Sequence, residues 1–334
     1  MYKLYSATVE LTRKCNARCK HCIVDALYEK ENEMSSERII KLIEELHDEG
    51  CEDITFTGGE PFLREDWALF VQKARSLNMN VVMMTNGLKI NDSIIKTLAM
   101  FNVSLGISLD GSCSDTHDSI RGVKGIFKHF TEIIPKLKKA GVYVGIPTTV
   151  MKSNFSELDK IRDLLLKLKV DIWQLQVVKP SSRLLESELL SETEYYELAK
   201  KIVDYRKKYG KKLNIVEADC IGYNSVLSPY LMFNEWRGCE CGIYSVSIES
   251  DGNVKGCPNM NNSEGNVSNT EFKEIWQSHE SFKYNRKPSV DYLTGFCKTC
   301  EHKYVCRGGC PTNAKTKNNN PYCLYKIEQI GVDN

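Results

Sequence analysis

Strand-like and helix-like segments alternate along the first half of this chain, and this alternation limits the folds open to it. Apolar stretches rich in β-branched residues read as strands, and the amphipathic stretches between them read as helices. Parallel strands need long connections, so the alternation predicts right-handed crossovers and a parallel sheet in an α/β fold. The expected strands span residues 7–11, 53–57, 80–85, 103–108, 143–150 and 171–178, and the expected helices span 35–49, 65–77, 93–101, 126–140 and 155–168.

Conspicuous loops follow the first four expected strands. In parallel sheets, functional groups gather at the carboxyl ends of the strands. We therefore expect these loops to converge on one rim of the sheet. In chain order they are residues 15–22, 57–61, 85–87 and 108–111.

The first of these loops carries Cys15, Cys19 and Cys22 in a Cys-x3-Cys-x2-Cys spacing. Three thiolates can hold three irons of a 4Fe–4S cluster and leave the fourth iron open to bind and reduce another molecule. The alternative is zinc. A structural zinc site is closed by four protein ligands, whereas this loop offers three thiols plus His21, so the spacing favours the iron–sulfur cluster.

This cysteine loop, followed by Gly58-Gly59-Glu60-Pro61 after the second strand, resembles the radical S-adenosylmethionine (SAM) enzymes. The resemblance covers essentially the whole chain and implies a partial (β/α)6 TIM-like barrel. In that family the open iron chelates the methionine end of SAM. Electron transfer into the sulfonium then yields a 5′-deoxyadenosyl radical that abstracts hydrogen from the substrate. The resemblance also implies a reductant such as flavodoxin or ferredoxin.

The loop after the second strand offers candidate ligands for SAM. Gly58 and Gly59 let the backbone pass close to a ligand and expose its polar groups. Glu60 supplies an acceptor for an ammonium group. On its own, Gly-Gly-Glu-Pro would read as an ordinary turn between a strand and a helix, and its place one strand after the cysteines favours the cofactor interpretation.

Further candidates lie on the same expected rim. Asn86, Ser108 and Asp110 could hydrogen-bond the ribose or the carboxylate of SAM, and helix capping or turn closure explains each of them about equally well. Arg121 lies in a segment, His117-Asp-Ser-Ile-Arg121-Gly, that also looks like the family. We expect Arg121 either to touch the cofactor or to pin its loop by an ion pair.

A second set of cysteines fills the last third of the chain. Cys241 and Cys257 flank Gly252, and a Cys-x2-Cys-x5-Cys-x3-Cys run and a final cysteine follow. The pattern resembles the SPASM module, a C-terminal extension of radical SAM enzymes that implies two auxiliary 4Fe–4S clusters. By position, Cys241, Cys257 and Cys310 would serve the first cluster, and Cys297, Cys300, Cys306 and Cys323 the second.

The fourth ligand of the first auxiliary cluster is open. Related enzymes place a cysteine several residues upstream, whereas Cys239 lies only two residues before Cys241. We choose Cys239, with Cys220 as the second choice and an iron left open for substrate as the third. A pair of zinc sites is the alternative for the whole set, because Cys297-x2-Cys300 alone fits a zinc ribbon.

The remaining cysteines have no assigned cluster. Cys51 begins the second strand, opposite the expected rim, and reads as a small apolar filler. Cys113 lies just beyond the Ser108–Gly111 turn, and Cys220 lies near the expected junction between domains. A thiol at either place could donate a hydrogen atom to a substrate radical, although a partly buried bystander explains both as well.

Composition bounds the broad class. The chain has 334 residues, 42% of them hydrophobic, enough for one large core and a smaller module. Its net charge of +1 favours neither nucleic acid nor anionic lipid as a partner. The sequence has no apolar run long enough to predict a membrane span. It has 14 cysteines and no export signal, which together favour metal ligation in the cytoplasm.

A change in composition places the domain boundary near 220–235. Beyond residue 236 cysteine, glycine and asparagine become more frequent and periodicity fades. We therefore expect a radical SAM core over residues 1–225 and a SPASM domain with two auxiliary clusters over 226–334. With the catalytic cluster, the expected cofactors are three 4Fe–4S clusters and SAM.

The substrate is less constrained than the chemistry. The SPASM resemblance favours a peptide or protein, most simply a ribosomal peptide that is cross-linked or epimerised. Because Cys15 leaves no room for an N-terminal leader-binding domain, a separate recognition protein is one expected partner. A sulfatase-type maturase is an alternative, weakened by Pro258-Asn259 where an aspartate base would be expected. A small-molecule enzyme of a cofactor pathway and a non-catalytic zinc-binding or electron-carrier module also remain open.

Overall fold

The computed structural model describes residues 2–28, 30–218, 221–231, 238–310, 312 and 320–331. In this part of the chain, ten strands form a single sheet. The strands are β1 (Ser6–Glu10), β2 (Asp53–Thr57), β3 (Asn80–Thr85), β4 (Ser104–Ile107), β5 (Val144–Val150), β6 (Ile172–Val177), β7 (Asn214–Glu217), β8 (Ser245–Ile248), β9 (Asn253–Lys255) and β10 (Gly265–Asn266).

Helices connect these strands and fill the C-terminal segment. The helices of the first part are α1 (Ser36–Asp48), η1 (Pro61–Leu63), α2 (Trp67–Ser76), α3 (Asp92–Met100), α4 (Ser114–Arg121), α5 (Ile126–Lys139), α6 (Lys152–Phe155), α7 (Leu158–Leu168), η2 (Glu186–Glu188), α8 (Glu192–Tyr209) and α9 (Ser228–Leu231). Those of the second part are α10 (Phe272–Gln277), α11 (Lys283–Arg286), α12 (Gly295–Thr299), α13 (Lys303–Cys306) and α14 (Leu324–Ile330).

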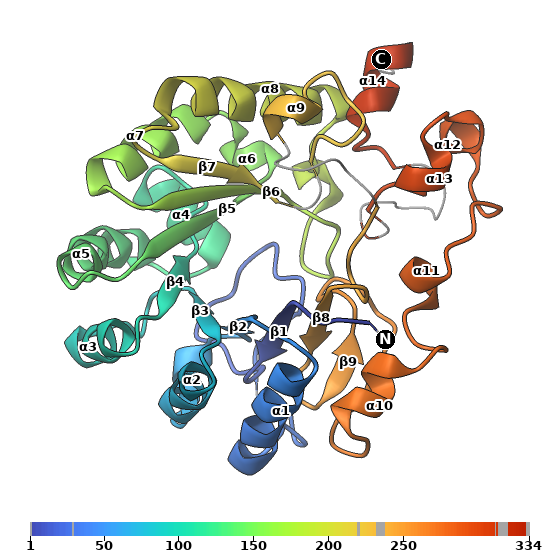
Figure 1. The fold of residues 1–334 in the computed structure, drawn as a ribbon. Coiled ribbons are helices and arrows are strands. Elements are labelled where there is room, and N and C mark those ends of the chain that lie inside the picture. The colour runs from blue at the N-terminus through green and yellow to red at the C-terminus, as the bar shows by residue number, and fades with distance from the viewer. Residues whose placement is uncertain are drawn as a thin grey trace.

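The sheet has the order β10-β9-β8-β1-β2-β3-β4-β5-β6-β7. Strands β1 to β7 pair in parallel with their neighbours in chain order, and the helices supply the long connections that parallel pairing needs. Figure 1 shows these strands curving into an incomplete barrel with α1, α2, α3, α5 and α7 on its outer side. The expected α/β fold and its partial barrel are confirmed.

The C-terminal segment extends the same sheet. Strand β8 pairs in parallel with β1, and β9 and β10 follow as antiparallel neighbours. These strands have four, three and two residues, too short to show a periodic pattern, and the sequence did not predict them. The sheet therefore continues past residue 225, where the domain boundary was expected. The boundary itself stays a prediction.

Helix α1 shows why the sequence pattern of the helices allowed them to be predicted. Ser35 caps its N-terminus by accepting the Arg38 N–H at 3.2 Å, and Gly50 follows its end with a φ of +97°. Ile39, Leu42, Ile43 and Leu46 form its buried face. Among the described residues, no helix combines the length and apolar character needed to cross a membrane.

Candidate active site

Three thiols lie in the loop that follows β1. Cys15, Cys19 and Cys22 are partly exposed, and none of them forms a disulfide. Each sulfur accepts a hydrogen bond at 3.5 Å or less, and such bonds stabilise a charged thiolate ligand. The three donors are the Ala17 N–H to Cys15 at 3.4 Å, the Ala26 N–H to Cys22 at 3.4 Å and Arg121 Nη1 to Cys19 at 3.5 Å.

The Cys15 thiol needs a positive partner to lose its proton. Burial raises the pKa of Cys15 to about 11, and the nearby Cys19 and Cys22 add to the rise. Metal binding would supply the positive charge and release the protons. Among the described side chains, no three His, Cys, Asp or Glu residues close around a point as the ligands of one ion do. Three free thiols that each accept a hydrogen bond are suited to bind a cluster of several irons, with one thiol on each of three irons.

Gly58 and Gly59 bring the turn after β2 against the cysteine loop. A Cβ on Gly58 would lie 2.4 Å from the Thr12 carbonyl oxygen, and one on Gly59 would lie 2.3 Å from that of Lys14. The Gly59 N–H donates to the Thr12 carbonyl at 2.7 Å. The glycines thus allow backbone to dock on backbone, and their contact with SAM stays a prediction.

Glu60 is fully buried below this turn. Its carboxylate accepts the Thr85 hydroxyl at 2.7 Å, the Asn86 N–H at 2.9 Å and the Phe62 N–H at 3.3 Å. Burial raises the pKa of Glu60 to about 7, although the three donors oppose the rise. Glu60 therefore ties the turn after β2 to the turn after β3, and its expected contact with an ammonium group stays a prediction.

Asn86 carries this connection on to the cysteines. Its Nδ2 donates to Asn16 Oδ1 at 2.7 Å and lies 4.0 Å from Cys15 Sγ. Ser108, after β4, is partly buried, and its N–H donates to the Thr85 carbonyl at 3.3 Å. Both residues lie on the expected rim, and hydrogen bonds from them to a ribose or carboxylate stay predictions.

Asp110 is fully buried and binds residues of the protein itself. One oxygen pairs with His21 Nε2 at 2.9 Å and with Arg121 Nη2 at 2.8 Å, and the other accepts the Thr149 N–H at 2.9 Å. Burial alone would raise the pKa of Asp110, but the Arg121 and His21 charges outweigh it and hold the pKa well below its usual range. In this structure Asp110 orients Arg121, whose other nitrogen reaches Cys19.

The end of helix α4 also holds the cysteine loop by hydrogen bonds. The Arg18 N–H donates to the Arg121 carbonyl at 3.0 Å, and the Lys20 N–H donates to that of Ile120 at 2.9 Å. His117 accepts the Asp110 N–H through Nδ1 at 3.0 Å, and burial lowers its pKa to about 4. The sequence prediction did not include helix α4, His117 or the pairing of His21, although the family-like segment around Arg121 pointed to this place.

The first C-terminal thiol group comprises Cys239, Cys241 and Cys257, all partly buried, with Cys310 buried beside them. Hydrogen bonds that Cys241 shares with its two neighbours lower the pKa of Cys239 and of Cys257 and raise that of Cys241. The buried Lys179 favours the charged form of Cys239, Cys257 and Cys310. The geometry is compatible with Cys239 as the fourth ligand, which stays a prediction, and Cys220 lies outside the described residues.

The second C-terminal group lines one pocket. Its walls include all four thiols predicted for the second auxiliary cluster, together with Tyr223 and Asn320. Burial raises the pKa of Cys306 to about 12 and that of Cys323 to about 11, and the neighbouring thiols add to both shifts. The four converging thiols are Cys297, Cys300, Cys306 and Cys323. Their convergence suits a cluster, and their role as ligands stays a prediction.

The other two described cysteines lie apart from these groups. Cys51 is buried, and its thiol donates to the Asp53 carbonyl at 3.2 Å, as suits a small residue of the core. Cys113 is exposed at the start of α4, and its sulfur lies 3.7 Å from the Thr116 hydroxyl. Hydrogen donation by Cys113 stays a hypothesis.

Comparison with known proteins decides the family. Residues 9–165 match the radical SAM superfamily, and residues 239–301 match SPASM, the iron–sulfur cluster-binding domain. An AdoMet-dependent heme synthase of Nitratidesulfovibrio vulgaris is 31% identical over 96% of this chain and 92% of the relative. The chain belongs to the radical SAM superfamily and carries a SPASM domain.

Two further similarities bear on this radical SAM protein. The Fe-coproporphyrin III synthase of Methanosarcina barkeri is 30% identical over 96% of this chain and 88% of the relative. The crystal structure of Streptococcus suis SuiB bound to its precursor peptide SuiA has a TM-score of 0.78 and 17% identity, covering 96% of this chain and 75% of SuiB. The likeness to SuiB concerns the fold.

Proposed function

We propose that Cys15, Cys19 and Cys22 hold a 4Fe–4S cluster and that the protein cleaves SAM reductively there. The observation that carries the proposal is a loop with three free thiols, each supplied with an N–H donor. The bound cluster and SAM would supply an electron and a deoxyadenosyl radical. The chain's own contribution is to fix the loop between the Gly58–Gly59 turn and helix α4.

The two C-terminal thiol groups support auxiliary clusters. Cys239, Cys241, Cys257 and Cys310 are proposed for one cluster, and the four thiols that line the pocket beside Tyr223 for the other. Lys179 would balance the negative charge of the first group. Clusters in these short helices and loops would supply much of the folding free energy of the C-terminal segment.

Two substrate classes are candidates. A heme-pathway small molecule is supported by two relatives that share 31% and 30% identity with almost the whole chain. The peptide substrate predicted from the sequence is supported by the SPASM domain and by the fold of SuiB, which binds a precursor peptide. The heme-pathway relatives share more of the sequence, so we place the small molecule first and cross-linking or epimerisation of a peptide second.

The reaction class is tested by product analysis. Protein reconstituted anaerobically with iron and sulfide is incubated with SAM and dithionite, and 5′-deoxyadenosine and methionine are quantified. We expect both products from the wild-type protein and neither from the Cys15→Ala/Cys19→Ala/Cys22→Ala variant. Equal yields from the two proteins would contradict the proposal.

The substrate class is tested with two probes in the same assay. Iron coproporphyrin III represents the small molecules, and a peptide encoded beside the gene represents the second class. We expect iron coproporphyrin III to increase 5′-deoxyadenosine formation and to change in mass. Stimulation by the peptide alone, with a change in the peptide's mass or stereochemistry, would favour the peptide substrate instead.

A further inference from the structure

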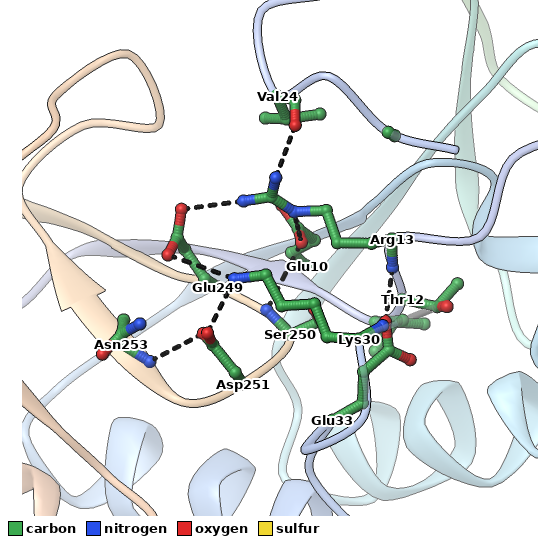
Figure 2. A network of polar contacts seen from close by, with 12 residues as sticks. Glu10, Thr12, Arg13, Val24, Lys30, Glu33, Glu249, Ser250, Asp251 and Asn253 are labelled. Carbon is green, nitrogen blue, oxygen red and sulfur yellow. Dashed lines mark hydrogen bonds and ion pairs between the residues drawn. The ribbon is translucent and has the colours of Figure 1, made fainter. Parts of the chain in front are cut away.

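A partly buried network of charges joins the cysteine loop after β1 to the turn between β8 and β9 (Figure 2). The loop contributes Arg13 and Lys30, and the turn contributes Glu249 and Asp251. Arg13 and Glu249 are 236 positions apart in the sequence. The network therefore connects the barrel's first loop with the C-terminal segment.

Arg13 fixes the cysteine loop at both of its ends. Its side chain pairs with Glu10 at 2.5 Å and donates to the carbonyl of Val24, and its backbone N–H donates to Glu33 at 2.6 Å. Arg13 lies two residues before Cys15, and Val24 lies two residues after Cys22. The position of all three thiols thus depends on where this guanidinium is held.

Glu249 holds that guanidinium from the C-terminal side. Its Oε1 lies 2.9 Å from Arg13 Nη2 and 2.6 Å from Lys255 Nζ, while Oε2 lies 3.7 Å from Lys30 Nζ. Lys255 lies two residues before Cys257. One carboxylate therefore bridges two cations, each of which lies two residues ahead of a cysteine proposed as a cluster ligand.

Partial burial makes this bridge stronger than an ordinary surface ion pair. The side chains of Arg13, Glu249 and Lys255 are 17%, 14% and 11% exposed. Exposed pairs contribute little, but removing one partner of a buried pair leaves an uncompensated charge. A second contact adds to the docking, because the Met34 N–H, beyond the loop, donates to the Ser250 carbonyl at 2.7 Å.

We propose that Glu249 couples the two cluster-bearing segments, so that the cysteine loop is ordered only when the Cys257 segment is folded around its auxiliary cluster. The proposal rests on the proposed function, since it takes Cys257 as a cluster ligand. Coupling of this kind is reciprocal, so iron bound in the cysteine loop would also protect the β8–β9 turn. Glu249 acts here as a positioning residue through Arg13 and Lys255.

Hydrogen exchange of the full-length, reconstituted protein tests the coupling. Exchange of the peptide covering residues 12–28 is measured in the wild type, Cys257→Ala, Glu249→Gln and the double variant. We expect Cys257→Ala to raise exchange in this peptide by roughly fivefold or more when Glu249 is present. In the Glu249→Gln background the same substitution should add little, because the connection is already lost. Glu274→Gln, an exposed carboxylate of α10, is the matched control and should leave the Cys257→Ala effect unchanged.

The outcomes separate the coupling from the proposed function. Equal effects of Cys257→Ala in the presence and absence of Glu249 would overturn the coupling. If Glu249→Gln loses protection from exchange throughout the barrel, Lys255→Met is used in its place. This substitution removes the ion pair between Glu249 and Lys255, so it should reduce the Cys257→Ala effect in the same way. An unreduced effect in Lys255→Met would then overturn the proposal. Iron analysis of the wild type decides the proposed function independently, because a protein without iron contradicts it whatever the exchange shows.

Discussion

Asp110 shows how single residues shape this site. Its carboxylate holds His21 and Arg121, its backbone N–H donates to His117, and its carbonyl accepts from Asn154 at 2.9 Å. A residue expected to bind the cofactor is thus engaged with the protein on every side. Its contribution is to keep a buried arginine beside the Cys19 thiol.

Replacing Asp110 by Asn should therefore destabilise the protein. The substitution leaves Arg121 buried without its carboxylate, and breaking a buried pair costs about 3–5 kcal/mol. The thermal unfolding midpoint of the anaerobically prepared protein measures the effect. Asp115→Asn, exposed in the same helix α4, should cost no more than about 1 kcal/mol. Equal losses in the two variants would show that Asp110 is not a buried anchor.

The raised pKa of Glu60 predicts that the free energy of unfolding depends on pH. Burial raises its pKa from 4.5 to about 7, so the folded protein holds the proton more tightly than the unfolded chain does. The resulting stabilisation is complete below about pH 4.5 and is lost as the pH rises through about 7. Glu60→Gln cannot titrate, so its unfolding midpoint should fall less than that of the wild type between pH 5 and about 7.5. Parallel pH profiles for the two proteins would contradict this assignment.

At the scale of elements, the turn after β2 and helix α4 hold the cysteine loop from two sides. The turn acts through backbone contacts that require Gly59 to lack a side chain. Helix α4 acts through hydrogen bonds from Arg18 and Lys20 to the carbonyls at its end. Residues 11–28 form no helix or strand beyond an isolated bridge between Lys14 and Leu27, so the conformation of the loop depends on both neighbours.

Gly59→Ala should consequently release the cysteine loop. The new methyl group would lie 2.3 Å from the Lys14 carbonyl oxygen, and both partners are backbone, so overpacking should cost about 1–3 kcal/mol or more. We expect less iron per chain after reconstitution and faster hydrogen exchange over residues 12–28. Gly141→Ala is the control: it has open space around it and a φ of +78°, so it tests backbone strain alone. A Gly59→Ala protein with wild-type iron content would argue against the docking role.

Elements with a strong periodic pattern were predictable from the sequence. Strand β2 and strand β3 have the expected bounds, and α5 (Ile126–Lys139) differs from expectation by one residue. Strand β9, with three residues, carries too little pattern to be recognised. The rim loops were also found correctly, because the topology of a parallel sheet determines where they lie. The partners of Asp110 were not, because they come from contacts between segments far apart in the sequence.

At the scale of the whole molecule, the barrel and the C-terminal segment share one sheet. Strand β8 extends it beside β1, next to the cysteine loop, while α12 and α13 lie farther out (Figure 1). Because β8 pairs directly with β1, the SPASM segment lies against the barrel within one sheet. Changes in the outer helices should therefore leave the barrel folded.

Cys306→Ala tests that separation. It removes one of four thiols around the pocket beside Tyr223, so the iron content should fall from about twelve to about eight per chain. Limited proteolysis should then cut the protein between α11 and α14, while the fragment containing β1 to β7 resists. Cleavage spread evenly over the chain would show that the two parts unfold together.

The central claim is that the cluster held by Cys15, Cys19 and Cys22 has an open iron that binds SAM. Electron paramagnetic resonance tests this most directly, on the wild-type protein with the spectrum of the Cys15→Ala/Cys19→Ala/Cys22→Ala variant subtracted to remove the signals of the auxiliary clusters. The account predicts a reduced 4Fe–4S signal whose g values shift when SAM is added. A reduced signal that SAM leaves unchanged, or a protein that binds zinc without sulfide, would contradict it.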